Sequence, residues 1–419
     1  MPRVPPAGSG VAPELREGEG AEPGAGSARA TNAAEALGGE WAGEGSRRYL
    51  VVERRYGASH LHGHVSVGDL LPTAGGAWPG FGFLPGAAAQ PEGPPLLFLD
   101  LETTGLAGGA GTYAFLVGCA WFADDAFVIR QFLLSAFTAE AVLLSAVERL
   151  ASGFGALVTY NGKSFDVPLL ENRLALHRMP GRLPDLPHVD LLHPARRLWS
   201  DLSGEGGGCR LMTLEEAHCG YVRVGDVPGF EIPARYFDFV RSADAEPLAA
   251  VLEHNRLDLL TLAAMTARVS AMLASAADGA TPREQLGVGR LLEAAGRVTE
   301  ATACFTLAAA GAVAPSPVRR EALRRLAMGL RRERKYAGAA EAWQALLESP
   351  GCSTAYAREA AEALAIHHEH RRRDPARARE FAAASLRHGQ SERTATALRY
   401  RLARLDRKLG SGAGGTLDL

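Results

Sequence analysis

The chain is poor in cysteine, and its cysteines form no recognisable pattern. Five occur in 419 residues, which is an odd number, and no two of them form a Cys-x-x-Cys pair. Such a scattered set supports neither a disulfide framework nor a zinc site. We therefore expect reduced cysteines that mostly pack in the core.

Long apolar runs are also missing. No uninterrupted apolar segment of about 18 residues is present, and no apolar stretch led by Lys or Arg stands at the N-terminus. These absences predict a soluble, cytoplasmic protein. Residues 1–45 contain Gly, Ala, Pro, Ser and Glu with almost no large apolar side chains. They cannot bury enough surface to offset the entropy of ordering, so we expect a disordered tail there and another at 411–419.

The net charge of −2 conceals an asymmetry along the chain. Residues 1–279 carry 21 Lys/Arg and 32 Asp/Glu, whereas residues 280–419 carry 24 and 15. The first part is therefore acidic, at −11, and the second basic, at +9. A basic half favours an anionic partner such as nucleic acid. An arginine-rich, solvated helical surface accounts for the same numbers equally well, and both interpretations stay open.

Two carboxylates stand at the end of an apolar run at 96–105, Leu-Leu-Phe-Leu-Asp-Leu-Glu-Thr-Thr-Gly. Successive side chains of a strand alternate faces, so Asp100 and Glu102 point the same way. Two anions this close repel each other unless a cation lies between them. The stretch thus predicts a divalent-metal site at a strand end. Small residues that let a substrate backbone approach follow it: Thr103, Thr104 and Gly105.

The segment after this strand is rich in glycine, but no Gly-Lys-Ser/Thr follows, which argues against a nucleotide P-loop. Residues 113–122 and 126–134 read as two strands joined by a turn, and 139–152 as a helix packed on the sheet. The meander predicts an antiparallel second strand.

The next strand after the meander, 156–160, also ends in a polar loop, and the helix that follows starts with Asp166. The carboxylate could simply cap the helix. The neighbouring polar side chains favour a site instead, because they could meet phosphate: Asn161, Lys163 and Ser164. A further short strand is expected at 188–192.

A long helix at about 246–274 contributes the last polar pair. His254 and Asp258 are four residues apart and share one helix face, while most of the neighbouring residues are apolar. An exposed helix pair is the ordinary explanation of such spacing. Here it is the one such pair on a helix dominated by core residues.

Two further clusters have a plain interpretation that we prefer. His60, His62 and His64 alternate and could bind metal, but a flexible, partly exposed loop explains them more simply. Trp199 follows two arginines, a combination that can grip single strands, yet a core tryptophan is the better reading.

Taken together, these motifs resemble the DEDD (DnaQ-like) 3′–5′ exonucleases of the ribonuclease-H-like fold over about residues 95–275. Asp-Leu-Glu-Thr-Thr-Gly-Leu looks like their first motif, the stretch 161–166 like the second and 254–258 like the third. Together with the glycine-rich run, His-Asn-x-x-Asp is most similar to bacterial predicted exonucleases in which tetratricopeptide repeats follow the nuclease domain. Three residues separate the histidine from the aspartate, which is the spacing of the tyrosine branch of the superfamily.

The resemblance implies an α/β fold with a mixed five-stranded sheet and two Mg²⁺ or Mn²⁺ ions. Asp100 would bridge both ions, Glu102 and Asp258 would complete the first, and Asp166 would serve the second. His254 would take a proton from the attacking water. The implied substrate-binding residues are Thr103, Thr104, Gly105, Leu106, Asn161, Lys163 and Ser164.

The second half of the chain repeats. Phe305, Trp343 and Phe381 are spaced at 38 residues, as are Ala308, Leu346 and Ala384. The pattern resembles tetratricopeptide helix pairs, which stack into a concave surface. Arginines of this region could give that surface a positive charge. These arginines are Arg319, Arg320, Arg324, Arg325, Arg331, Arg332, Arg334 and Arg371–Arg373.

We thus expect an N-terminal extension and linker at 46–94, an exonuclease domain at 95–279 and helical repeats at 280–410. The predicted function is a metal-dependent 3′–5′ exonuclease on single-stranded DNA or RNA, with a possible protein partner at the repeats and no membrane. The alternative is a catalytically weak or inactive adaptor that binds nucleic acid and recruits proteins.

Overall fold

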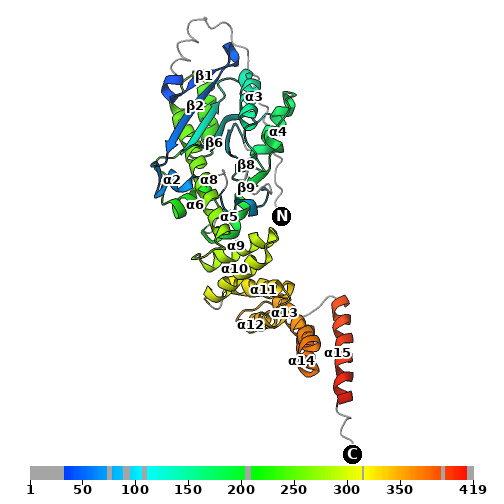
Figure 1. The fold of residues 1–419 in the computed structure, drawn as a ribbon. Helices are drawn as coiled ribbons and strands as arrows, with labels where there is room; N and C mark the ends of the chain where they lie inside the picture. Colours follow the sequence, from blue (N-terminus) through cyan, green and yellow to red (C-terminus); the bar gives the residue numbers. More distant parts are fainter. Residues whose placement is uncertain are drawn as a thin grey trace, which may run out of the picture.

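The computed structural model describes residues 33–72, 78–87, 95–105, 111–202, 209–313, 316–387 and 392–412. An α/β domain with a seven-stranded mixed sheet is followed by an all-helical region that leads away from it toward the C-terminus (Figure 1). The predicted fold class is confirmed.

The sheet has the strand order β1-β2-β7-β6-β5-β8-β9. Its strands are β1 (Glu40–Ala42), β2 (Tyr49–Gly57), β5 (Leu96–Thr103), β6 (Ala114–Ala123), β7 (Ala126–Leu133), β8 (Ala156–Thr159) and β9 (His188–Asp190). The predicted meander is confirmed, because β6 runs antiparallel to both β5 and β7. β8 and β9 continue the sheet in parallel on the other side of β5.

The sheet is wider than the five strands expected, because β1 and β2 extend it beyond β7. Part of the predicted disordered tail 1–45 is therefore wrong. Residues 33–37 are helical, with Ala33 and Leu37 buried, and β1 pairs with β2. This short strand gains its order from backbone hydrogen bonds to β2, the next strand along the chain, so its own composition could not reveal it. Residues 1–32 lie outside the described part.

Helices cover both faces of the sheet. One face packs against α3 (Glu140–Ala151), α4 (Asp166–Leu176) and α7 (Ile232–Ser242). The other packs against α5 (Leu192–Trp199), α6 (Leu211–Cys219) and α8 (Ala249–Ala274). Helix α8 is long and apolar enough to cross a bilayer, but 72% of its most apolar stretch is buried inside the protein. It is the central core helix on its face of the sheet.

Smaller elements connect these layers. A two-stranded sheet is formed by β3 (Leu61–His62) and β4 (Val65–Ser66). The short helices are α2 (Val67–Leu70), η1 (Gly45–Arg47), η2 (Phe81–Phe83), η3 (Phe137–Ala139), η4 (Leu183–Asp185), η5 (Ser200–Leu202) and η6 (Glu246–Leu248). All five cysteines are free and four are buried, as expected.

The helical region consists of successive packed helices. They are α9 (Pro282–Ala294), α10 (Val298–Gly311), α11 (Pro317–Arg332), α12 (Tyr336–Leu347), α13 (Thr354–His367), the π-helical turn η7 (His368–Arg372), α14 (Pro375–Arg387) and α15 (Glu392–Gly412). Phe305, Trp343 and Phe381 fall on α10, α12 and α14, that is, on every second helix. Helix α15 enters the segment 411–419 that was predicted to be disordered, because it continues to Gly412.

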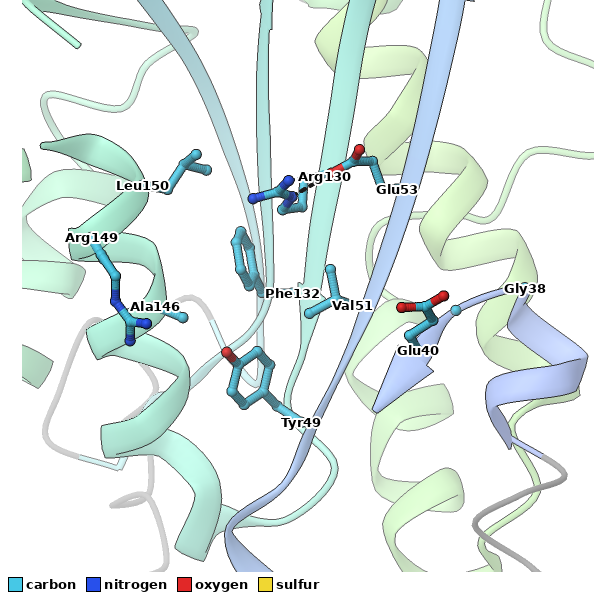
Figure 2. Close-up of a pocket in the computed structure, with 11 residues that line it drawn as sticks. Gly38, Glu40, Tyr49, Val51, Glu53, Arg130, Phe132, Ala146, Arg149 and Leu150 are labelled. Carbon is cyan, nitrogen blue, oxygen red and sulfur yellow. Dashed lines mark hydrogen bonds and ion pairs between the residues drawn. The ribbon is translucent and has the colours of Figure 1, made fainter. Parts of the chain in front are cut away.

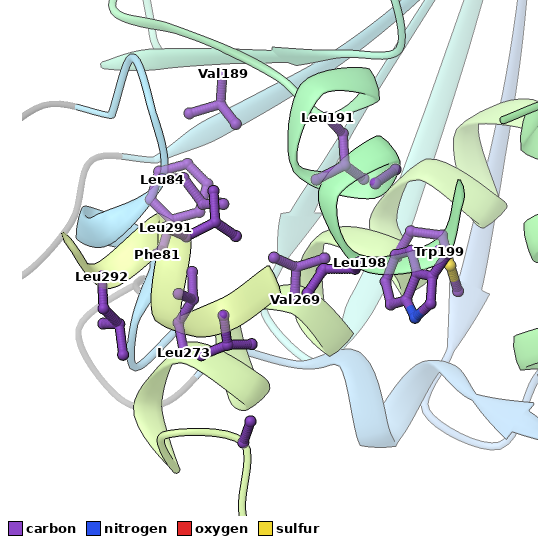
Figure 3. Packing of buried hydrophobic residues seen from close by; sticks show 14 of the residues in the cluster. Phe81, Leu84, Val189, Leu191, Leu198, Trp199, Val269, Leu273, Leu291 and Leu292 are labelled. Atoms are coloured by element: carbon purple, nitrogen blue, oxygen red, sulfur yellow. The ribbon is translucent and has the colours of Figure 1, made fainter. Parts of the chain in front are cut away.

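The helical region is joined to the α/β domain by one continuous apolar core. Leu291 and Leu292 of α9 belong to the same cluster as Leu198 of α5 and Leu273 of α8 (Figure 3). Trp199 is a core residue, as preferred above, with 2% of its surface exposed. It closes the junction by donating from Nε1 to Glu284 Oε1 at 2.9 Å.

At this junction the helices approach closely. A Cβ added at Gly287 of α9 would lie 2.7 Å from the carbonyl oxygen of Arg197 on α5. Only glycine allows that contact without a shift of one helix. The predicted boundary near residue 280 thus separates two parts that share a core.

Candidate active site

The alternation of side chains along β5 decides where its carboxylates lie. Leu97, Leu99 and Leu101 pack into the core on the face of α3, α4 and α7. Phe98 packs into the core on the face of α8. Asp100 and Glu102 have the same parity as Phe98, so they face α8. The two carboxylates thus lie on one side of the strand, as the sequence predicted.

Helix α8 meets Asp100 through a buried asparagine. Asn255 Nδ2 donates to Asp100 Oδ2 at 2.8 Å, and Asn255 Oδ1 accepts from Gln131 Nε2 at 2.9 Å. Asp100, Gly118 and Gln131 are neighbours across β5, β6 and β7. A Cβ at Gly118 would lie 2.2 Å from Asn255 Oδ1, so the glycine makes room for the amide. This bridge fixes the orientation of the Asp100 carboxylate.

Asp166 is the first residue of α4, and the capping interpretation is wrong, since the N-cap is Phe165 and makes no side-chain bond. The preceding loop is held by Asp190 at the end of β9. Its carboxylate accepts from the backbone amides of Asn161 at 2.8 Å and Lys163 at 3.1 Å. Asn161 adopts a left-handed backbone, with φ of 68°. Burial, followed by the charge of Asp190, raises the pKa of Asp166 to about 7.

His254 and Asp258 are brought together by α8, as predicted, with His254 Nε2 3.6 Å from Asp258 Oδ2. The other ring nitrogen, Nδ1, lies 2.8 Å from Asp226 Oδ1. Asp226 lies in the irregular segment between α6 and α7, and Arg223 of that segment connects Asp226 with Asp258. Arg223 donates to Asp258 Oδ1 at 2.5 Å and to Asp226 Oδ2 at 3.2 Å, and its side chain is only 2% exposed.

This arginine belongs to a larger buried network. Arg223 also donates to Glu215 Oε2 at 2.5 Å, while Glu215 Oε1 accepts from Thr261 at 2.6 Å and lies 2.9 Å from His62 Nε2. Burial opposes ionisation of Glu215, but hydrogen bonds from His62, Arg223 and Thr261 outweigh it and lower the pKa. The loop interpretation of His62 is therefore wrong. His62 lies on β3 with 2% of its surface exposed, and it contacts Glu215, the partner of Arg223.

The four predicted carboxylates share one electrostatic environment. Burial, and then the charges of Asp258, Glu102 and Asp166, raise the pKa of Asp100 well above its ordinary value. Burial, and then the charges of Asp258 and Asp166, also raise the pKa of Glu102 well above its ordinary value. Burial also raises the pKa of Asp258, against the attraction of Arg223 and His254. These groups are thus close enough to repel one another strongly.

An oxygen-rich, mutually repelling set of this kind fits a hard divalent cation such as Mg²⁺ or Mn²⁺. Within the described parts of the chain, no three His, Cys, Asp or Glu side chains are already gathered around one metal position. Asp100, Glu102, Asp166 and Asp258 influence one another's pKa values without forming such a group. The chemistry of these donors matches the metal-binding prediction made from the sequence.

The threonines predicted to contact substrate are engaged within their own turn. Thr103 Oγ1 donates to the carbonyl oxygen of Gly105 at 3.0 Å, and Thr104 Oγ1 accepts from the amide of Tyr113 at 2.9 Å. They shape the chain on either side of a segment that includes Leu106, which lies outside the described residues. Their contact with substrate stays a prediction.

The polar residues of the 161–166 loop point in different directions. Ser164 is exposed and donates from its backbone amide to the carbonyl oxygen of Asn161. Lys163 lies near His188 instead of near the carboxylates. Burial and then the Lys163 charge lower the pKa of His188 to about 4.

A separate hollow of about 700 Å³ lies at the β1 edge of the sheet, between β1, β2, β7 and α3 (Figure 2). It has charges of both signs, and its Arg130 pairs with Glu53 at 2.5 Å. None of the predicted site residues lines it. It is therefore not part of the candidate active site.

Sequence reasoning missed several residues that hold the site together. Asp190 had a weak signal, because it is a carboxylate inside the short strand predicted at 188–192, but only the structure shows that the strand ends there. Asn255 stands beside His254 but looks like an ordinary polar helix residue. Arg223 and Asp226 come from an irregular segment without periodicity, where no pattern points to them.

A mixed sheet with an antiparallel second strand, and carboxylates between its central strand and a long helix, are the features expected of a ribonuclease-H-like fold. Residues 97–270 match the family model of the RNase_H superfamily. Members of this superfamily are commonly nucleases.

A curated relative is similar over part of its length. Over 233 residues the chain is 36% identical to "Uncharacterized protein YprB" of Bacillus subtilis (strain 168), an alignment that covers 54% of each protein. The chain thus spans about half the length of the curated relative it matches.

Proposed function

We propose that this protein is a divalent-metal-dependent nuclease that removes nucleotides from the 3′ end of single-stranded DNA or RNA. The carboxylate cluster carries the proposal. Four acidic side chains held near one another, at the cost of raised pKa values, serve little purpose in a protein that never binds a cation. A domain of the RNase_H superfamily is the expected setting for such chemistry.

The ligands in this proposal are Asp100, Glu102, Asp166 and Asp258. Two bound divalent ions would supply an activated water and stabilise the leaving oxygen. The chain itself supplies orientation. Asn255 fixes Asp100, and Asp190 holds the loop that presents Asp166.

His254 is the proposed base. Because its Nδ1 lies against Asp226, that nitrogen carries the proton, and Nε2 is left as the acceptor. Nε2 lies on the side of Asp258, where the attacking water would be held. The three-residue spacing to Asp258 places the imidazole one helical turn before the carboxylate, within reach of the site.

One observation favours the alternative of a weakly catalytic, nucleic-acid-binding adaptor. Arg223 already neutralises Asp258 at 2.5 Å, so this carboxylate has an internal cation as partner. A site that used Arg223 in place of an ion would bind strands without cleaving them. The two functions therefore differ in whether divalent ions promote hydrolysis.

The deciding experiment incubates 5′-labelled single-stranded DNA and RNA of one sequence with Mg²⁺, Mn²⁺ or EDTA. We expect a ladder that shortens from the 3′ end with either ion and no products with EDTA. Asp100→Asn should abolish the products, whereas Asp125→Asn, in the exposed turn between β6 and β7, should not. If both substrates stay intact, or the Asp100 variant is as active as wild type, the nuclease proposal fails. Immediate release of the labelled 5′ nucleotide would refute the direction.

A further inference from the structure

The helical region contains a pocket that no part of the nuclease site explains. It has a volume of about 360 Å³ and lies between α12 and α13, next to the end of α11 and the turn η7. In Figure 1 these elements lie well below the sheet, toward the C-terminal end. Six of its lining residues carry positive charge or aromatic rings: Arg331, Tyr336, Trp343, His367, His370 and Arg371.

The lining is cationic and contains no carboxylate. Several other arginines of this region are neutralised, which corrects the expectation that they all add charge to a binding surface. Arg324 pairs with Glu359 at 2.5 Å, and Arg325 pairs with Glu293 at 2.6 Å. Among the described residues, no ion pair is made by Arg331 or by Arg371. The two arginines of the pocket therefore keep their positive charge free of an acidic partner among the described residues.

The nearest acidic residue does not cancel this charge. Glu369 precedes two of the lining residues, but its side chain is 1% exposed and turned toward α15. It accepts from Arg401 at 2.9 Å and from Arg404 at 2.6 Å. Its one link to the lining is His370, whose Nε2 is 3.6 Å away.

The aromatic part of the pocket is arranged for stacking. The Arg371 guanidinium lies 3.9 Å from the centre of the Tyr336 ring, and Trp343 forms the buried base, 5% exposed. Four aliphatic residues complete the walls. A guanidinium stacked on an aromatic ring keeps its outer face and its donors available to a planar, anionic ligand.

The backbone at the pocket is also unusual. Residues His368–Arg372 form a π-helical turn, after which Arg373 is left-handed, with φ of 55°. Such turns are rare and are found frequently at functional sites, because they re-aim side chains. Here the turn contributes His370 and Arg371 to the pocket.

We propose that the α12–α13 pocket binds one nucleotide of a single-stranded nucleic acid, an inference that rests on the proposed nuclease function. Arg331 and Arg371 contact backbone phosphates, and a base stacks on the Arg371–Tyr336 pair. Charge without carboxylates selects an anion, and the stacked ring selects a planar one. The volume is at the small end of ligand sites, which suits a single nucleotide.

The test measures binding of fluorescein-labelled oligothymidylate to the full-length protein by anisotropy, in EDTA so that no strand is cleaved. Arg371→Ala should weaken binding about fivefold or more and lower the salt dependence by about 0.7 in the log–log slope, as expected for one lost phosphate contact. Its neighbour Arg372→Ala is the matched control, since it removes the same charge outside the pocket. That variant should change affinity less than twofold.

Tyr336→Leu separates stacking from charge, because it should weaken binding without altering the salt slope. Equal losses at positions 371 and 372, or wild-type affinity in the Arg371 and Tyr336 variants, would show that the pocket is not the site. Displacement of the strand by an equal charge concentration of polyglutamate would show a general anion site and overturn nucleotide recognition.

The outcomes keep the two proposals apart. Binding that depends on Arg371 in a protein that shortens no strand with Mg²⁺ would refute the nuclease and leave the pocket. Cleavage that requires Asp100, together with binding indifferent to Arg371, would refute the pocket and leave the nuclease.

Discussion

The strongest quantitative prediction concerns Asp166→Asn, which removes one charge from the cluster and keeps the shape of the side chain. The ordinary pKa of the carboxyl is 3.8, and burial beside Asp190 raises the folded value to about 7. Between these values the folded state keeps a proton that the unfolded state releases. The free energy of unfolding therefore falls as pH rises through this window, by about 1.4 kcal/mol per pH unit.

Above about pH 7 the accumulated cost is on the order of 4 kcal/mol, because the shift spans about three units. Loss of a favourable charge at the start of α4 costs the variant only about 0.3–1 kcal/mol, so the gain dominates. We expect Asp166→Asn to be more stable than wild type near pH 8 and equal to it or slightly less stable near pH 4. Bound Mg²⁺ should narrow the difference by stabilising wild type.

The assay is urea unfolding of the full-length protein in EDTA across this pH range, comparing wild type, Asp166→Asn and Asp125→Asn. Taking the difference between proteins at each pH cancels the titration of every other group. The exposed control should track wild type throughout. A difference between wild type and Asp166→Asn that does not change with pH, or a variant that is less stable near pH 8, would refute a pKa of Asp166 raised by burial and by Asp190.

Two further changes probe the supports of the site. Gly118→Ala would force a Cβ to within 2.2 Å of Asn255, so we expect a lower melting temperature and slower cleavage. Gly57→Ala, with open space around it, should leave both quantities unchanged. Equal effects of the two substitutions would contradict the packing argument. Arg223→Gln leaves buried carboxylates such as Asp258 without their partner, which should cost about 3–5 kcal/mol near pH 8. The loss should shrink near pH 5, where those groups take up protons, and a loss that is independent of pH would rule out this explanation.

Much of the α/β domain could be predicted because its signals are local. Short apolar runs bounded by turn residues located the five central strands, and a strand that ends on two carboxylates marked Asp100 and Glu102 without any tertiary information. The helical period brought His254 and Asp258 to one face of α8. These patterns depend only on the geometry of an isolated strand or helix.

The missing parts depend on contacts that no pattern within a single element encodes. β1 is ordered by β2 and not by its own composition. Arg223 is defined by three carboxylates that come from α6, the following irregular segment and α8, so neither its burial nor its partners could be read from its neighbours. Asn255 matters because Gly118 faces it across the sheet, a relation that exists only once the strands are in register.

The continuous core between α9 and the α/β domain has a mechanical consequence. The apolar cluster that contains Leu259 of α8 also contains Leu291 of α9 and Trp343 of α12, so the α/β domain and the α12–α13 pocket belong to one packed body. A strand long enough to reach both would be held twice, and its end would be presented at a raised effective concentration. Shorter strands would lose that advantage abruptly, so the rate of shortening should fall at a particular residual length set by the protein itself.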